Sequence, residues 1–295
     1  MDTEQKKSSL TERLTSNDGK VEDDKSLAYK IFTASLSTIL ANIAFPLQDT
    51  ISLAFIGHLN ESLLMSSLGF GIMWSSAFGT AILVGIGIGF NVVASQAFGA
   101  KNYRKLGLSL QKHLVVVGLS CIGIILMMFL CESIMKLVGY DELLAETTGR
   151  LTRNFSPFLI GSGLFMTFNF YLVGQNIFDV GAKAAGLGTL LHVLFCFIFV
   201  NCLGLGLNGI ALAKCLTAFS SAGFLMVYVK LKNPTPESLI PWTKECLQGL
   251  KEYAKEVYGH GSAIYIELIT FECSTLLMGW LNDYAIIGGH TAVLN

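Results

Sequence analysis

Residues 62–100, with the sequence SLLMSSLGFGIMWSSAFGTAILVGIGIGFNVVASQAFGA, contain no charged side chain and are bounded by Glu61 and Lys101. A helix needs about 20 mostly apolar residues to cross the hydrocarbon core of a bilayer. This stretch is much longer than that. It therefore predicts a membrane helix that either tilts strongly or extends beyond the bilayer.

Other apolar stretches of membrane-spanning length predict an all-α, polytopic bundle of about seven transmembrane helices. The predicted spans are 27–57, 63–98, 114–137, 155–174, 184–203, 207–229 and 257–281. The composition agrees, because mean hydropathy is +0.58 and only 14% of the 295 residues are charged. Both values are unusual for a soluble protein. A net charge of -1 also makes nucleic acid an unexpected partner.

Residues 1–26 mix charged side chains with Ser and Thr, which predicts a disordered tail rather than a cleaved signal peptide. Lys and Arg in short loops favour the cytoplasmic side of a membrane. On the side of the tail, the predicted loops contain Lys101, Arg104, Lys105, Lys183, Lys230, Lys232, Lys244, Lys251 and Lys255. On the other side they contain Lys136, Arg150 and Arg153. We therefore expect a multi-pass protein with a cytoplasmic amino terminus.

Two ionisable residues inside predicted spans are candidates for function, because hydrocarbon disfavours charges that do not pair or contact water. Asp49 lies in the first span near Pro46. It either binds protons or substrate, or helps to satisfy the backbone groups that the proline frees. Lys214 lies about two turns into the sixth span. It either meets a carboxylate or a water-filled cavity, or extends its long side chain to the membrane surface.

The last predicted span contains two carboxylates, Glu267 and Glu272. Five positions of an α-helix separate them by about 140° around the axis and about 7.5 Å along it. They can flank a cavity or face two different neighbours. A carboxyl group in an apolar environment can hold a proton at neutral pH and release it when a cation or water arrives. Proton-coupled export of a cation requires this property.

His260 and Glu256 precede Glu267 by seven and eleven positions, roughly along one side of the same helix. They form a candidate proton path toward the cytoplasm. In the alternative interpretation, Glu256 simply meets water at the membrane boundary, and Gly259 and Gly261 disrupt the helix around His260.

Gly85 and Gly89 have the spacing typical of close helix contacts in membranes, and we interpret them as packing residues. No nucleotide-binding loop, catalytic triad or metal-ligand spacing accompanies them in the sequence. The seven cysteines are expected to act as small apolar residues. We therefore expect no enzyme activity, no metal and no cofactor other than a coupling ion.

Several stretches occur in an order that resembles a known family. They are FIGHL at 55–59, VASQAFGAKNY at 93–103, Pro157, LVGQ at 172–175, His192, GLGLNGIALA at 204–213, and Glu267, Phe271 and Glu272. Together they resemble the multidrug and toxic compound extrusion (MATE) family of transporters, in particular its eukaryotic branch. No single stretch is diagnostic, but their order and spacing are specific.

The resemblance implies a twelve-helix fold of two lobes. It also implies an antiporter that exchanges protons, or sodium in some members, for organic cations or xenobiotics by alternating access. It assigns cation recognition and proton coupling to Glu267 and Glu272. Gln175 and Asn208 are weaker polar matches. The implied organisation is a tail at 1–26, an amino-terminal lobe at 27–230, a cytoplasmic linker at 231–256, and the seventh helix with the start of a second lobe at 257–295.

This sequence departs from the family pattern at Gly259, where a proline is usual, and at Lys214, where a small or neutral residue is usual. It stops where the eighth helix would begin, so we expect a truncated form. Self-association or a second membrane chain would then supply the other lobe. Two alternatives remain: a non-transporting scaffold subunit in a larger complex, and a related lipid or glycan flippase. The resemblance suggests a plasma or vacuolar-type membrane.

Overall fold

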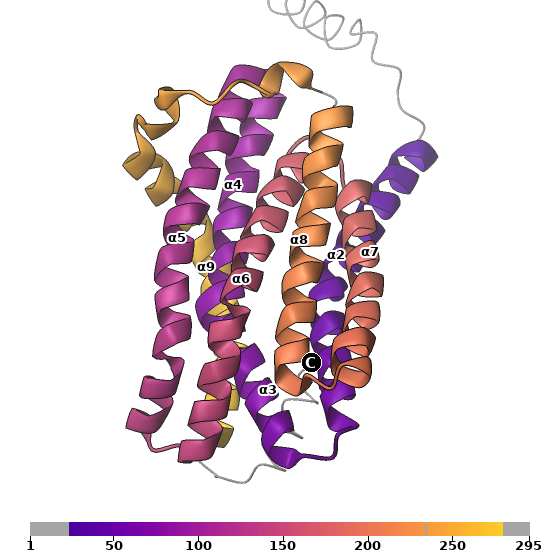
Figure 1. Ribbon diagram of the computed structural model, residues 1–295. Coiled ribbons are helices and arrows are strands. Elements are labelled where there is room, and N and C mark those ends of the chain that lie inside the picture. The colour runs from indigo at the N-terminus through magenta and orange to yellow at the C-terminus, as the bar shows by residue number, and fades with distance from the viewer. Residues whose placement is uncertain (1–23, 234, 280–295) are drawn as a thin grey trace, which may run out of the picture.

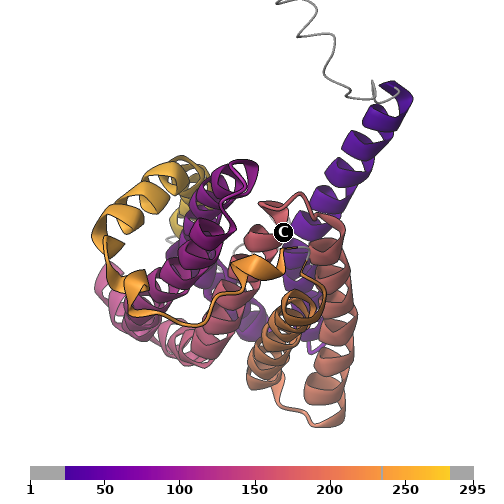
Figure 2. The same ribbon diagram turned by 90° about the horizontal axis from the view of Figure 1, so that it is seen from above.

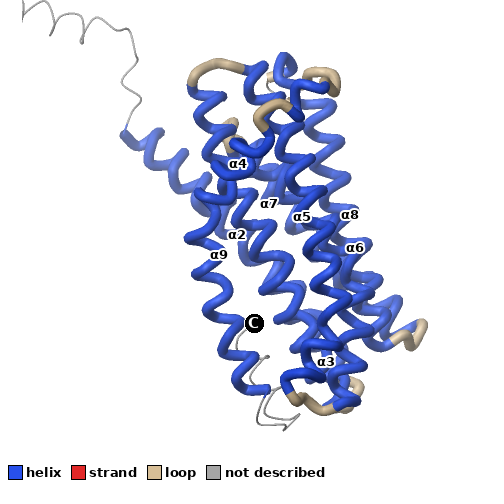
Figure 3. The backbone as a smooth tube through the Cα atoms, turned by 90° about the vertical axis from the view of Figure 1, so that its left-hand side faces the viewer, coloured by secondary structure: helices blue, strands red, loops and turns tan. Residues whose placement is uncertain are grey.

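The computed structural model describes residues 24–233 and 235–279, and within them the side chains of residues 24–28, 30, 42 and 271–279 are not described. In that part of the chain every regular element is helical, and no strand occurs (Figure 3). The α-helices are α2 (Asp24–Gly57), α3 (Ser62–Ser75), α4 (Ala81–Gly99), α5 (Tyr103–Val138), α6 (Glu142–Val173), α7 (Asp179–Cys196), α8 (Gly206–Lys232) and α9 (Leu250–Gly279). The shorter elements are the π-helical segments η1 (Ser76–Thr80) and η2 (Phe197–Cys202) and the 3-10 turns η3 (Pro236–Ser238) and η4 (Lys244–Leu247).

Six helical segments of the described chain are long and apolar enough to cross a membrane. They are Ile31–Gly57, Ser62–Gly99, Tyr103–Val138, Glu142–Val173, Asp179–Cys202 and Gly206–Lys232. The prediction of an all-α membrane bundle is therefore confirmed. α9 has sufficient length but is not among these six. Which end of the bundle faces the cytoplasm stays a prediction.

The charge-free stretch at residues 62–100 forms one continuous helical segment, which consists of α3, η1 and α4. It is 38 residues long. At 1.5 Å per residue the segment measures about 57 Å, against about 30 Å for the hydrocarbon core. A segment of this length must tilt or project from the bilayer, as the sequence predicted. A π-helical segment such as η1 is a common place for a helix to change direction.

α6 occupies the middle of the bundle and packs against both α5 and α8. Viewed from above, α4, α5 and α9 lie on one side of it and α2, α7 and α8 on the other (Figures 1 and 2). Large apolar side chains are exposed on the outer surface of α5, including Leu119, Ile122, Leu126 and Phe129. Such a surface suits a lipid solvent and would be costly in water.

α9 packs along α4 through glycines, which confirms the packing role predicted for Gly85 and Gly89. A Cβ atom on Gly89 would overlap the carbonyl oxygen of Val257, and one on Gly261 would overlap that of Gly85. The absence of side chains therefore lets the two backbones approach closely. The alternative in which Gly259 and Gly261 disrupt the helix is wrong, because α9 runs unbroken from Leu250 to Gly279.

α9 also begins earlier than the predicted residue 257. Its first turns contain Lys251, Glu252, Lys255 and Glu256, all exposed. These residues are good helix formers, but hydropathy cannot detect a helix that has left the apolar region. The predicted linker of 231–256 is therefore shortened at both ends, since α8 continues to Lys232.

The chain between α8 and α9 is fastened to one end of the bundle (Figure 1). The side-chain amide of Gln111 donates to the carbonyl oxygens of Ile240 at 3.2 Å and Pro241 at 2.9 Å, and its oxygen accepts from the backbone N–H of Thr243 at 3.2 Å. Arg104 forms an ion pair with Glu245 at 2.8 Å. Residues 235–249 therefore follow the surface of the bundle closely.

Candidate functional site

Asp49 on α2 and Lys214 on α8 form an ion pair in the interior of the bundle. The Lys214 side chain is only 4% exposed and the Asp49 side chain 21% exposed. The lysine therefore does not extend to the membrane surface. Of the interpretations that the sequence left open, the one with a carboxylate partner agrees with the structure. A buried charge with its counter-ion avoids most of the penalty that either group alone would meet.

Two aromatic rings of α6 flank the same ammonium group. The Nζ atom of Lys214 lies 5.1 Å from the ring centroid of Phe155 and 5.0 Å from that of Phe158. These distances are within the range of cation–π attraction, which is stronger where water is excluded. A carboxylate and two ring faces therefore surround the positive charge.

Polar side chains of α2 and α8 that lie close to the ion pair in sequence form hydrogen bonds with α7. Ser52, one turn after Gln48, lies with its hydroxyl 2.9 Å from Nε2 of the fully buried His192. The other ring nitrogen of His192 lies 3.3 Å from the hydroxyl of Thr217. Gln48 donates to the hydroxyl of Thr189 across 3.4 Å. These polar side chains of α2, α7 and α8 thus have partners inside the bundle, as buried polar groups generally do.

Gln48, Ser52, Thr189 and Thr217 were not predicted from the sequence as parts of this network. The signal was present, because Gln48 and Ser52 are four residues apart and Lys214 and Thr217 are three apart. Such spacings place both members of a pair on one helix face. What the spacing alone could not give is which faces meet.

A small cavity lies between α2, α6, α7 and α8. The cavity bordered by Gln48, Phe158 and Thr217 has a volume of about 10 Å³. This is at the lower limit for one water molecule. In this conformation the cavity is too small for an organic molecule.

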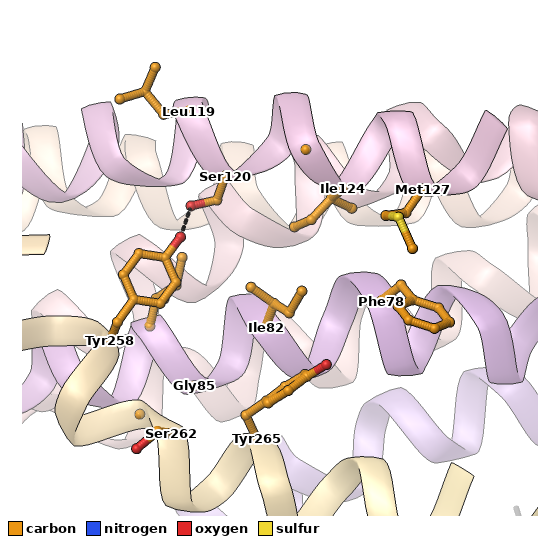
Figure 4. Close-up of a pocket in the computed structure, with 13 residues that line it drawn as sticks. Phe78, Ile82, Gly85, Leu119, Ser120, Ile124, Met127, Tyr258, Ser262 and Tyr265 are labelled. Carbon is orange, nitrogen blue, oxygen red and sulfur yellow. Dashed lines mark hydrogen bonds between the residues drawn. The ribbon is translucent and has the colours of Figure 1, made fainter. Parts of the chain in front are cut away.

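A much larger cavity lies between α4, α5 and α9, with a volume of about 520 Å³. Figure 4 shows Phe78, Ile82 and Gly85 on α4 and η1, Ser120 and Ile124 on α5, and Tyr258, Ser262 and Tyr265 on α9 around it. The lining is mostly apolar, and the hydroxyls of Ser120 and Tyr258 lie 2.6 Å apart across it. Its size and character are typical of small-molecule sites.

Three ionisable residues of α9 are exposed, whereas the side of the helix that packs against α4 is buried. Val257 and Gly261 are buried against α4, whereas Glu256, His260 and Glu267 are exposed. Glu267 has no ion pair among the residues whose side chains are described. Glu272 lies on α9, but its side chain is outside the described residues. The pairing of the two glutamates in space therefore stays a prediction.

Gln175 and Asn208, the two weaker polar matches to the family, do not contact the ion pair. The buried Gln175 accepts a hydrogen bond of 2.5 Å from Thr235, next to the linker. Asn208 is exposed near the start of α8, at the other end of the bundle, and accepts a hydrogen bond of 2.9 Å from Asn154. The two residues therefore lie at opposite ends of the bundle, and their role in binding stays a prediction.

Comparisons with known proteins agree with this architecture. The MatE family model matches residues 37–198, which is more than half of the 295-residue chain. Protein DETOXIFICATION 17 of Arabidopsis thaliana is 32% identical over 234 residues, covering 79% of this chain and 49% of its own length. Multidrug and toxin extrusion protein 1 of Danio rerio is 25% identical over 257 residues, covering 87% of this chain and 42% of its own. The chain thus spans about half the length of the curated relatives it matches.

Solved structures show the same fold. The crystal structure of the eukaryotic MATE transporter AtDTX14 superposes with a TM-score of 0.83 at 23% identity, over 90% of this chain and 59% of that chain. The Vibrio cholerae MATE transporter VcmN in its bent form gives a TM-score of 0.68 at 16% identity, over 92% of this chain and 64% of that chain.

Proposed function

This chain belongs to the MatE family of multidrug and toxic compound extrusion transporters, and from that premise we propose that it serves proton-coupled export of organic cations or xenobiotics. Export would proceed by alternating access, with the carboxylates of α9 as the site where proton and substrate compete. Family membership supports the general statement that the chain is part of a membrane transporter and needs no cofactor.

The proposal rests on a contrast between two carboxylates. Asp49 is already neutralised by Lys214, whereas the exposed Glu267 has no cationic partner in the part of the chain with described side chains. A carboxylate without a cationic partner can exchange a proton for an external cation. A carboxylate with a permanent counter-ion gains little from either, because the counter-ion already balances its charge. Glu267 therefore meets this requirement better than Asp49 does.

The cavity beside α9 supports a role in binding flat organic molecules. Its aromatic lining includes Phe78, Tyr258 and Tyr265, and its 520 Å³ volume lies within the usual range of about 300–1,000 Å³ for drug-sized ligands. Ring faces attract organic cations as well as neutral aromatic molecules. Glu267 follows Tyr265 by two positions, so it lies on the same segment of α9 but on another side of the helix.

Alternating access in this architecture requires a second helical bundle against the first. We propose that this bundle packs on the exposed face of α9, where Glu256, His260 and Glu267 lie. A further segment, a second copy of this chain or another membrane chain can supply it. A flippase would need a cationic side chain inside the bundle to bind a phosphate head group, and Lys214, which could serve this purpose, is instead paired with Asp49.

The test is uptake of a fluorescent organic cation into vesicles containing the purified chain, driven by a proton gradient and, separately, by a sodium gradient. Glu267→Gln and Glu272→Gln should each abolish gradient-driven uptake, because the amide cannot exchange a proton. The matched control is Glu237→Gln, the same chemical change on the exposed η3 turn. Uptake that survives in both α9 variants would contradict the proposal. Well-folded protein that transports nothing would favour a scaffold or a missing partner.

A further inference from the structure

The surroundings of the Lys214 ammonium have the composition of a binding site for an organic cation. One carboxylate oxygen, from Asp49, contacts it, and two ring faces, from Phe155 and Phe158, lie about 5 Å away. Carboxylates combined with aromatic faces are how proteins recognise alkylammonium ligands. Here the ligand is a side chain of the protein itself.

The neighbouring helices contribute no second charge to this site. Gln48 and Ser52 lie within one turn of Asp49 on α2, Thr217 lies one turn after Lys214 on α8, and these neutral side chains contact Thr189 and His192 of α7. Each ring nitrogen of His192 lies within hydrogen-bond distance of a hydroxyl group. Asp49 is therefore the only carboxylate that the described residues place against Lys214.

Access to the site is limited by the lysine. Because the Lys214 ammonium contacts Asp49 and its side chain is only 4% exposed, an external cation can take its place between the carboxylate and the two rings only if the ammonium leaves. The lysine stem is almost fully buried and shares the bundle interior with Phe158, so leaving would empty a packed volume. The carboxylate, in contrast, retains partial exposure and is reachable once the ammonium is gone.

We propose that Lys214 is a built-in occupant of a primary-ammonium site formed by Asp49, Phe155 and Phe158. It keeps external cations out of the six-helix bundle and confines cation recognition to α9. This inference deepens the proposed function and rests on it for the role of α9. The occupation of the site by Lys214 does not depend on whether the chain transports a substrate.

The proposal predicts that an external alkylammonium ion can replace the missing side chain. Lys214→Ala removes the atoms from Cγ to Nζ, which match propylammonium in heavy-atom number and charge. The deleted volume then becomes a cavity next to an unpaired carboxylate and two ring faces. Propan-1-ol has the same shape without the charge and serves as the neutral control.

The experiment is thermal unfolding of the full chain in detergent at constant ionic strength, with propylammonium chloride, sodium chloride or propan-1-ol. All proteins carry Glu267→Gln and Glu272→Gln, so that the α9 carboxylates cannot contribute. In this background, Lys214→Ala should gain about 2–4 °C with saturating propylammonium and nothing with propan-1-ol. The protein with Lys214 intact should gain nothing, and adding Asp49→Asn to Lys214→Ala should remove the gain.

A Lys214→Ala protein that shows no stabilisation by propylammonium, or equal stabilisation with Asp49→Asn, would overturn the proposal. If Lys214→Ala is not recovered as folded protein, expression and purification with propylammonium should recover it only when Asp49 is present. No recovery under that condition would also overturn the proposal. Because the α9 glutamates are absent throughout, a negative result here is distinct from the loss of transport that would contradict the proposed function.

Discussion

Gly261 on α9 lies so close to Gly85 on α4 that a Cβ atom on Gly261 would overlap the Gly85 carbonyl oxygen. Gly261→Ala should therefore separate the two helices or strain them. We expect a loss of about 1–3 kcal/mol, as for other overpacked contacts. Because the displaced atoms belong to the backbone, no side-chain rotation can relieve the overlap. Thermal unfolding of the purified chain measures the effect.

Gly259→Ala provides a matched control on the same helix. No atom lies within 4 Å of a Cβ at Gly259, and the residue is exposed. Alanine favours helix over glycine, so this variant should be unchanged or stabilised by up to about 1 kcal/mol. Equal destabilisation of both variants would mean that α9 does not pack on α4 in the folded protein.

The ion pair between Asp49 and Lys214 should give strongly unequal single-variant effects. Asp49→Asn leaves the deeply buried ammonium without a counter-ion and should cost about 3–5 kcal/mol. Lys214→Met should cost less, because it keeps the volume of the side chain and leaves the more exposed partner unpaired. The double variant should be more stable than the sum of the single effects indicates.

Thermal unfolding of this double-mutant cycle can be compared with a cycle on Asp179 and Lys183. That pair is also acidic–basic, but both side chains are more than half exposed. It should show much smaller coupling, as exposed pairs usually do. Similar coupling energies in the two cycles would contradict the burial of Lys214.

The bundle was predictable because lipid imposes a length and a polarity on every spanning helix. The contact at Gly85 and Gly89 was predictable because small residues at that spacing serve few other purposes in a membrane helix. The partner of Lys214 was not predictable from the sequence, because Asp49 is 165 positions away. Periodicity identifies the face of a helix but not the helix that packs against it. Gln175 and Asn208 show the same limit, since their partners Thr235 and Asn154 belong to other elements.

Gln111 should hold the linker against the bundle, because its side chain makes hydrogen bonds with Ile240, Pro241 and Thr243. Gln111→Ala removes all of them and leaves these half-buried backbone groups without that partner. Trypsin should then cleave after Lys244 several times faster than in the parent chain, since local opening exposes this segment. The rate of appearance of the fragments, followed by gel electrophoresis, checks this expectation.

The control for the linker experiment is Gln248→Ala, which changes the same residue type at an exposed position of the same linker. Its cleavage rate should equal that of the parent chain. Faster cleavage in the control as well would mean that the linker is held by its own local turns rather than by Gln111.

Replacing the buried His113 of α5 should stabilise the folded protein. It is fully buried, stacks on Phe90 at 4.3 Å between ring centroids, and neither ring nitrogen has a hydrogen-bond partner among the described residues. A buried polar group without a partner costs about 1–3 kcal/mol. His113→Phe keeps the ring stacking and removes both nitrogens, so it should raise the free energy of unfolding by about 1 kcal/mol.

His192→Phe is the contrasting variant, because it breaks the contacts with Ser52 and Thr217 and should destabilise the protein. Thermal unfolding distinguishes the two, and a destabilised His113→Phe protein would mean that water or another group pairs with this imidazole.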